Sequence, residues 1–393
     1  MVGSRTMKLR EGTPEEVGIS SSRINHIIER GEQWVHEGIH PALVLLAARK
    51  GVIFIHKAFG KLTPSEDAPH LPLDAVFGLA SLTKPITSTC AMVLVENGLL
   101  GLNRPVQEYI PEFVGEGKEQ VMIHHLLTHT SGISDQIVDE MITKKIEDEI
   151  ELPEMEETQH PRNHRSLHYG FEAPLSTRPG EVMVYNDFGI FLLAEVIRRL
   201  SSMSLESFAT EWIFNPLGMR DTHYVVPKEL QSRVVLRAED GPAAHLNDVD
   251  LQERPEPASG AYGSAPDLAV FGQMFLNQGI YGETRVLSPA TVVAMTRNQI
   301  RGIKARYFDE EFPEASWGLG WSVNADYKGE VYGEQLLSPS YYVHGGAGGV
   351  VLWIDPVQEI VGVFFSVLTQ TLDDRPLLGA DLFMNMVTAA VGE

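Results

Sequence analysis

The chain has 393 residues, 43% of them hydrophobic, and this length and composition allow a large core in one large domain or two interleaved ones. It carries 31 Lys and Arg residues against 53 Asp and Glu residues, so its formal net charge is −22. Such a charge repels phosphate backbones and anionic lipid surfaces, and we expect neither a nucleic acid nor a membrane as a partner.

The N-terminal segment and the single cysteine narrow the cellular context. Residues 1–18 lack the apolar stretch of a signal peptide, and no apolar run approaches the length of a membrane span. We therefore expect a cytoplasmic protein. Cys90 has apolar neighbours, which indicates a small buried side chain rather than a nucleophile.

The first predicted elements are a helix and a hairpin. Apolar residues at helical spacing predict an amphipathic helix over 21–37. Two β-rich runs, 42–48 and 52–56, predict a hairpin with at least one buried strand. A second helix is predicted over 82–97, and helical spacing then dominates as far as Trp212.

Strand character returns at 342–354 and 359–368, before a closing helix over 377–391. Strands near both termini with helices between them favour the α+β class over alternating βαβ units. We predict an antiparallel sheet flanked by helices. The sheet domain comprises 1–81 and 259–393, a mainly helical domain is inserted over 82–258, and the active site lies at their junction.

The sharpest chemical signal is Ser81-Leu82-Thr83-Lys84, a Ser-x-x-Lys sequence typical of active-serine enzymes. If a helix begins near Ser81, residues i and i+3 share one face with Cβ atoms about 5–6 Å apart, so the amine can reach the hydroxyl. A serine needs an adjacent base and a free lysine is protonated at pH 7, so we expect the pKa of Lys84 to be lowered to about 7. In isolation, the commoner interpretation of these four residues is a helix start with a capping serine and a solvated lysine.

Two further segments carry candidate site residues. Tyr185 follows a Pro-Gly turn and precedes an apolar helical pattern, where it could relay a proton or simply lie in the core. His344-Gly345-Gly346 begins a glycine-dense strand whose backbone a substrate can approach, because glycine has no Cβ. Those glycines could equally mark a bulge or tight sheet packing.

Taken in order, Ser81-x-x-Lys84, Tyr185-x-Asp187 and His344-Gly345-Gly346 resemble the motifs of the penicillin-binding-protein and class C β-lactamase superfamily. Four other stretches are similar to it: 124–133, 213–222, 259–271 and 317–323. The resemblance spans roughly residues 12–391 and implies a β-lactamase/transpeptidase-like fold. The His-Gly-Gly strand that runs into Trp353-Ile354-Asp355-Pro356 looks most like the family VIII carboxylesterases.

The resemblance implies a role for each motif residue. Ser81 would be the nucleophile, Lys84 the base or proton relay, and Tyr185 the partner that activates the serine and protonates the leaving group. The remaining implied residues are the oxyanion-hole backbone N–H groups of Ser81 and Ala347 and the substrate-binding residues Asp187, His344, Gly345 and Gly346. It implies no cofactor and no metal.

Two departures from the superfamily pattern bear on the substrate. Asp187 stands where asparagine is common, and His344 stands where many β-lactamases carry lysine. A neutral histidine is a weaker anion site than lysine, and an ionised Asp187 adds negative charge, so neutral esters suit the pocket better than β-lactams.

We therefore expect a serine hydrolase that forms an acyl-enzyme, a carboxylesterase acting on short-chain esters. The alternatives are a β-lactamase or a D-amino-acid peptidase of the DD-carboxypeptidase type, and a catalytically silent homologue that binds a ligand. The expected partner is a small ester or amide, and the oligomeric state stays open.

Two rival chemistries are disfavoured. The chain has no Gly-x-Ser-x-Gly elbow of an α/β-hydrolase. His160, His164 and His168 fall at i, i+4 and i+8, a spacing that a metal could use on one helix. Because Pro161 disfavours a continuous helix through the triplet, we expect a loop near the mouth of the active site and no metal.

Overall fold

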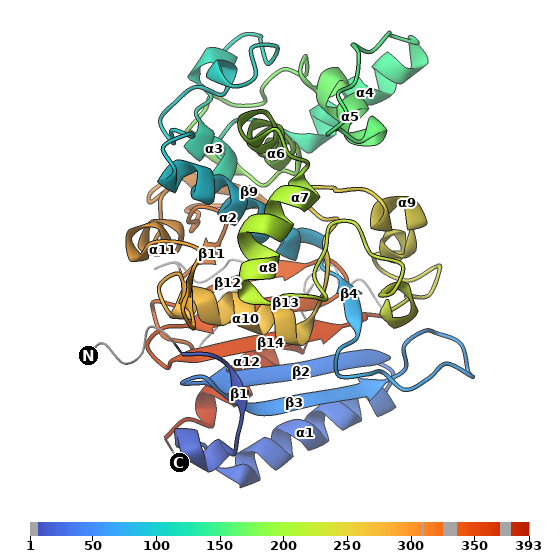
Figure 1. Cartoon of the computed structure of the whole chain (residues 1–393), viewed down its shortest axis with the longest axis vertical. Helices are drawn as coiled ribbons and strands as arrows, with labels where there is room; N and C mark the ends of the chain where they lie inside the picture. Colours follow the sequence, from blue (N-terminus) through green and yellow to red (C-terminus); the bar gives the residue numbers. More distant parts are fainter. Residues whose placement is uncertain (1–6, 308–309, 325–335, 370–378, 393) are drawn as a thin grey trace.

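The structure is a computed structural model that describes residues 7–307, 310–324, 336–369 and 379–392. A seven-stranded sheet lies in the lower half of the molecule (Figure 1) in the order β1-β3-β2-β14-β13-β12-β11. The strands are β1 (Arg10–Glu11), β2 (Ala42–Arg49), β3 (Val52–Gly60), β11 (Ser322–Val323), β12 (Tyr342–Gly346), β13 (Val350–Asp355) and β14 (Ile360–Ser366). Neighbouring strands are antiparallel, except that β1 is parallel to β3. Because β2 pairs with β14, segments from both ends of the chain lie side by side.

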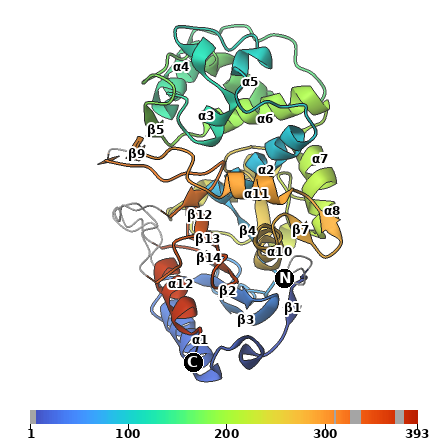
Figure 2. The ribbon, with the colours of Figure 1, turned by 90° about the vertical axis from the view of Figure 1, so that its left-hand side faces the viewer.

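The central strands send alternate side chains into two cores. Leu43 and Leu45 of β2 pack on one face with α1 (Ser21–His36) and α12 (Ala380–Ala389). Val44 and Leu46 join the larger core on the other face, which α10 (Ala265–Leu276) covers. Figure 2 shows α1 and α12 together below the sheet, with α10 on its other side. Strand β2 is therefore buried on both faces, at the centre of the half of the molecule that contains the sheet.

The helical part lies above the sheet in both views (Figures 1 and 2). Its helices are α2 (Thr83–Glu96), α3 (Ile123–Leu127), α4 (Asp135–Glu147), α5 (Pro161–Gly170), α6 (Phe188–Ser201), α7 (Leu205–Ala209), α8 (Asn215–Leu217) and α9 (Val249–Gln252), and α11 (Pro289–Met295) follows α10. Three small sheets complete the structure: β10 (Glu310–Phe312), β9 (Lys304–Tyr307) and β5 (Val182–Val184); β4 (Val76–Gly78) and β6 (Tyr262–Ser264); and β7 (Ile280–Tyr281) and β8 (Thr284–Arg285). The whole of α2 from Thr83 to Leu94 is buried, so the helix that follows Ser81 is a core helix.

The predicted α+β class is confirmed, because strands from both ends of the chain form one largely antiparallel sheet flanked by helices. The single strand predicted over 342–354 is wrong. The chain forms a hairpin there, since Gly348 and Gly349 adopt φ values of +87° and +104°, which glycine alone reaches without strain. Residues 377 and 378 of the predicted closing helix lie outside the described residues.

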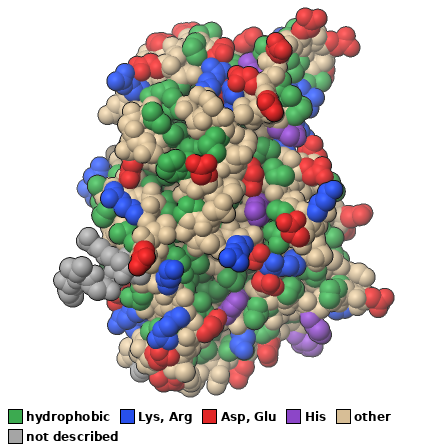
Figure 3. Space-filling view, viewed as in Figure 1, with side chains coloured by type: hydrophobic (Ala, Val, Ile, Leu, Met, Phe, Trp, Pro, Cys, Tyr) green, Lys and Arg blue, Asp and Glu red, His purple; other side chains and the backbone are tan. Residues whose placement is uncertain are grey.

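The surface and the helix lengths bear on the expected partners. Acidic and basic side chains are interspersed over the face drawn in Figure 3. Among the helices of the described ranges, none combines the length and apolarity needed to cross a bilayer.

Candidate active site

Ser81 lies on a one-turn 3₁₀ helix, Ala80–Leu82, between strand β4 and helix α2. The residue before it, Ala80, has a φ of +45°, a left-handed conformation that costs a residue with a Cβ about 1–2 kcal/mol. Leu79 anchors the turn, because its N–H donates to the Ala261 carbonyl and its own carbonyl accepts the Leu82 N–H. The predicted helix start near Ser81 is thus a tight turn that leads into α2.

The Lys84 side chain is fully buried among polar groups of the site. Its Nζ lies 3.0 Å from Ser81 Oγ, 2.7 Å from Asp187 Oδ1 and 3.2 Å from the Ala258 carbonyl oxygen. The i, i+3 spacing therefore does bring the amine to the hydroxyl, and the alternative of a solvated lysine is wrong.

The expected lowering of the Lys84 pKa is also wrong. Burial alone would favour the neutral amine, but attraction to Asp187 and Tyr185 outweighs it and raises the pKa above its usual value. The sequence pattern shows the lysine's distance from Ser81, but not the carboxylate that a distant segment brings to it. In the resting structure Lys84 is an ammonium group.

Tyr185 and Asp187 lie in the short link between β5 and α6. The Tyr185 ring centroid is 4.7 Å from Lys84 Nζ, and its hydroxyl interacts with the side chains of both Lys84 and Ser81. Burial, partly opposed by Lys84, raises the pKa of Tyr185. The link is held by Asp135 at the start of α4, whose carboxylate accepts the backbone N–H groups of Asp187 (2.6 Å) and Phe188 (3.0 Å). Ser81, Lys84, Tyr185 and Asp187 therefore form one contact network.

The C-terminal end of β12 forms another wall of the site. Strand β11 pairs with β12 only at Tyr342 and Val343, so the His344–Gly346 end of β12 extends beyond it. A Cβ on Gly346 would lie 2.1 Å from the Leu79 carbonyl oxygen and 3.1 Å from Ala80 Cβ. The absence of a Cβ thus lets β12 pack against the turn that carries Ser81, and Ala347 follows at once on the exposed side.

His344 is buried and neutral at pH 7. Burial, reinforced by the Lys84 cation, lowers its pKa to about 3, although Nδ1 is engaged with the Gly345 carbonyl at 2.8 Å. The end of β12 therefore contributes backbone groups and a neutral imidazole ring, while Lys84 and Asp187 carry the charges of the site.

The β-lactamase family model matches residues 27–381. The chain belongs to the β-lactamase family. The predicted relationship to penicillin-binding proteins and class C β-lactamases is thereby confirmed. A Salmonella agona (strain SL483) protein, named provisionally as a D-alanyl-D-alanine carboxypeptidase, is 24% identical in an alignment of 417 positions that covers 96% of this chain and 90% of that one.

Solved structures support the same relationship at the level of fold. A penicillin-binding-protein homologue from Caulobacter crescentus superposes with a TM-score of 0.75 at 19% identity, covering 95% of this chain and 99% of its own. A family VIII carboxylesterase superposes with a TM-score of 0.73 at 20% identity, covering 94% and 98%. At these identities the two structures show a shared fold.

The sequence of this β-lactamase-family chain did not identify several residues that border the site. His129 and Trp317 pack against Tyr185, with ring centroids 4.6 and 5.8 Å away. Burial, together with the charge of Lys84, lowers the pKa of His129 well below its usual value, so His129 is also neutral. Both residues lie in stretches that resemble the superfamily, at 124–133 and 317–323, and that was the only signal available.

A second carboxylate supports Lys84 indirectly. Glu256 is buried, and its carboxylate accepts hydrogen bonds from the backbone N–H groups of Ala258 (3.1 Å) and Ser259. These bonds hold the segment whose Ala258 carbonyl accepts a hydrogen bond from Lys84 Nζ. Burial, and then the charge of Asp187, raises the pKa of Glu256. No local spacing links Glu256 to the Ser-x-x-Lys motif, so the sequence alone gives no sign of it.

The histidine triplet adopts a different structure from the one expected. Residues 161–170 form helix α5 rather than a loop, because Pro161 sits in the first turn, where its missing N–H is tolerated. His160 precedes that helix as its N-cap, and His164 Nε2 lies 3.0 Å from the Pro153 carbonyl. Within the described ranges, no group of three or more His, Cys, Asp or Glu side chains is arranged to hold a metal ion. Cys90 is fully buried in the core, as expected.

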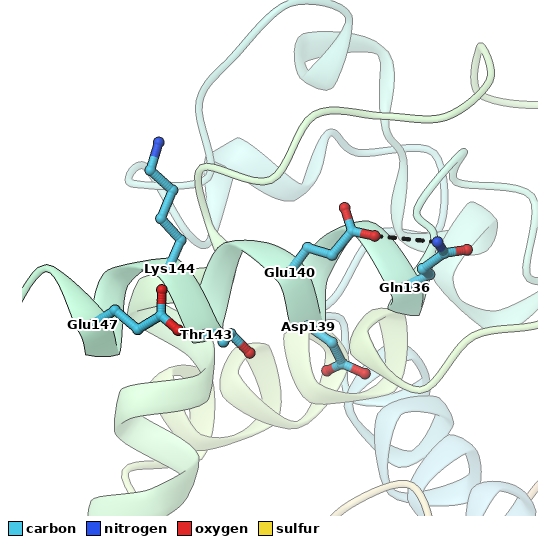
Figure 4. A pocket seen from close by; sticks show the side chains of 6 residues that line it. All are labelled: Gln136, Asp139, Glu140, Thr143, Lys144 and Glu147. Atoms are coloured by element: carbon cyan, nitrogen blue, oxygen red, sulfur yellow. Dashed lines mark hydrogen bonds between the residues drawn. The ribbon is translucent and has the colours of Figure 1, made fainter.

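A surface cavity of about 580 Å³ lies along α4 rather than at Ser81. Figure 4 shows its six lining side chains, all on that one helix: Gln136, Asp139, Glu140, Thr143, Lys144 and Glu147. A surface formed by one helix lacks the enclosing walls of a ligand pocket, so we do not assign it to the substrate. One of its lining residues, Asp139, interacts electrostatically with the site, because burial and then the charge of Asp187 raise the pKa of Asp139.

Proposed function

We propose that this protein is a serine hydrolase that forms an acyl-enzyme on Ser81 and acts as a carboxylesterase on short-chain esters. The observation that carries the proposal is the buried network in which Lys84 Nζ lies 3.0 Å from Ser81 Oγ and the Tyr185 hydroxyl contacts both side chains. A nucleophile within hydrogen-bond reach of a proton-handling pair is the geometry that covalent catalysis requires.

In the proposed reaction, the Lys84–Tyr185 pair first releases one proton to solvent, which leaves Lys84 as a neutral amine. Ser81 Oγ then attacks the ester carbonyl carbon while its proton passes to this deprotonated pair. The backbone N–H groups of Ser81 and Ala347 stabilise the negative charge on the carbonyl oxygen. When the carbon–oxygen bond to the alcohol breaks, Tyr185 returns the proton to the leaving oxygen. Water then attacks the acyl-enzyme by the same route in reverse, releasing the acid and restoring Ser81.

The strand wall favours esters over β-lactams. His344 is neutral at pH 7, so β12 lacks the cation with which a Lys-Thr-Gly strand can meet a β-lactam carboxylate. The family VIII carboxylesterase among the structural neighbours supports this choice. The provisional name of the Salmonella relative supports a DD-carboxypeptidase as the second candidate.

The test compares p-nitrophenyl butyrate, nitrocefin and a D-alanyl-D-alanine peptide on one preparation, with fluorophosphonate labelling in parallel. We expect labelling at Ser81, with loss of both labelling and hydrolysis in Ser81→Ala, and the highest kcat/KM for the ester. Labelling at another serine would overturn the assignment of the nucleophile. If nitrocefin is preferred tenfold or more, about 1.4 kcal/mol of transition-state stabilisation, the protein is a β-lactamase. Activity should also survive EDTA, because backbone amides polarise the carbonyl.

A further inference from the structure

His129 follows helix α3 and has an unusual backbone conformation. Its φ is +56°, which lies in the left-handed region. Thr128 ends the helix, so His129 occupies the first position beyond it. A left-handed residue at that position is usually glycine, because a Cβ makes the conformation costly. Residues held in such conformations concentrate at functional sites, so a buried histidine here needs an explanation beyond the end of a helix.

His129 holds the backbone on both sides of Tyr185. Its carbonyl accepts the Val184 N–H at 2.8 Å, and its Nδ1 accepts the Asn186 N–H at 3.4 Å. The Asp135 carboxylate holds the link further along, where α6 begins. His129 therefore contacts the part of the link that carries the tyrosine.

The imidazole ring of His129 also packs on the tyrosine. The ring centroids of His129 and Tyr185 are 4.6 Å apart, and the Trp317 ring lies 5.2 Å from His129. Burial, reinforced by the Lys84 cation, lowers the pKa of His129 well below its usual value, so the ring is neutral. A neutral imidazole has one donor and one acceptor nitrogen, so a hydrogen bond accepted at Nδ1 places the proton on Nε2.

We propose that His129 is a positioning residue for Tyr185 and that it acts through the acceptor at Nδ1. This inference rests on the proposed esterase function, in which Tyr185 returns a proton to the leaving alcohol. A hydroxyl that must reach first Ser81 and then the leaving oxygen tolerates little displacement. Strand β5 ends at Val184 and its pairing with β9 ends there too, so the sheet does not hold the tyrosine. His129 supplies that hold.

The test depends on the leaving group of the ester. p-Nitrophenyl butyrate releases a stable phenolate that needs no proton from Tyr185, whereas ethyl butyrate releases an alkoxide that needs one. Both esters form the same butyryl-enzyme, so the ratio of their kcat/KM values reports the acylation step alone. A displaced Tyr185 should therefore lower kcat/KM more for ethyl butyrate than for p-nitrophenyl butyrate. A residue that serves only packing would lower both values alike.

Three variants separate these outcomes. His129→Phe keeps a ring but removes Nδ1, so the ratio of p-nitrophenyl butyrate to ethyl butyrate should rise about tenfold or more. His129→Asn offers a side-chain oxygen near the position of Nδ1 and suits the left-handed φ, so its ratio should stay within about threefold of wild type. His125→Phe is the matched control, because His125 Nδ1 also accepts a backbone N–H, that of Met122 at 3.1 Å, but at the start of α3. It should leave the ratio unchanged.

Two results would overturn the proposal: an unchanged ratio in a folded and active His129→Phe, or a ratio in His129→Asn as high as that in His129→Phe. If His129→Phe does not fold, His129→Gly takes its place, because glycine adopts the left-handed φ freely and also lacks the acceptor. Failure of the esterase function itself would appear separately, as a wild type that hydrolyses neither ester and is not labelled at Ser81.

Discussion

Two lysines are buried in the part of the chain that the structure describes, and their surroundings move their pKa values in opposite directions. Lys84 meets the Asp187 carboxylate, and its pKa is raised despite burial. Lys118, in the 3₁₀ turn Lys118–Gln120, donates to the carbonyls of Val114 and Phe171 and lies 4.9 Å from the Phe113 ring centroid. Burial lowers its pKa to about 8, with only weak opposition from Glu172.

The main difference between the two sites is a carboxylate in direct contact with the amine of Lys84. Carbonyl dipoles and an aromatic face stabilise an ammonium group less than a full negative charge does, so desolvation decides the pKa of Lys118 and the ion pair decides that of Lys84. A buried lysine is therefore not in itself a base at neutral pH. At the active site, Asp187 holds the amine in the form that orients Ser81 and Tyr185 but cannot yet accept a proton.

The largest expected effect separates the two lysines by function. Lys84→Met should lower kcat/KM for p-nitrophenyl butyrate by about 10²–10⁴, because the proton of Ser81 loses its acceptor. The side chain of Asp187 is 44% exposed, so water can solvate the carboxylate left behind. Lys118→Met removes a buried amine of the same length and should leave kcat/KM nearly unchanged. Similar losses in the two variants, with both folded by circular dichroism, would show that Lys84 acts only through packing.

Converting the environment of Lys84 toward that of Lys118 gives the second prediction. In Asp187→Asn the burial that lowers the Lys84 pKa remains, while the strongest opposing attraction is gone. The amine form is the base, so kcat/KM rises with pH as it becomes populated, and the rising limb should move to lower pH by about one unit or more. At a pH on the wild-type limb, the variant should be about tenfold closer to its own plateau.

The control for this shift is Asp139→Asn. Asp139 lies near Asp187 electrostatically but is not paired with Lys84, so its neutralisation should move the limb far less. An unchanged limb in Asp187→Asn, or one displaced to higher pH, would mean that the ammonium form is the active one and that Tyr185 alone takes the serine proton.

The same contrast explains what could be predicted from the sequence. The i, i+3 spacing of Ser81 and Lys84 is local and survives folding, so the 3.0 Å contact was predictable. The ion pair with Asp187 and the bond to the Ala258 carbonyl join distant segments, and neither follows from periodicity. That is why the direction of the Lys84 pKa shift was predicted wrongly although the residue was identified.

The fold shows the same division between local and long-range information. The strand segments near both termini follow from apolar patterning, and the sheet that joins them confirms the α+β class. The hairpin at Gly348 and Gly349 was missed, because the glycines suit an open strand as well as a turn when no pairing partner is known.

The smallest expected effect concerns stability at Lys118 rather than activity. Its folded pKa of about 8 lies below the value of about 10.4 for an unfolded lysine. Between these pH values the unfolded chain binds more protons than the native protein, so this residue makes the free energy of unfolding rise with pH through that window. Below pH 8 both states are protonated, and the cost of burying the charge is constant.

Because other groups also titrate in this window, the quantity to measure is the difference in the free energy of unfolding between wild type and Lys118→Met, from denaturant unfolding at pH 7 and pH 9.5. Wild type should gain stability relative to the variant over that interval. A constant difference would show that Lys118 is solvated well enough to keep an ordinary pKa, and the contrast with Lys84 would then reflect only the ion pair and not burial.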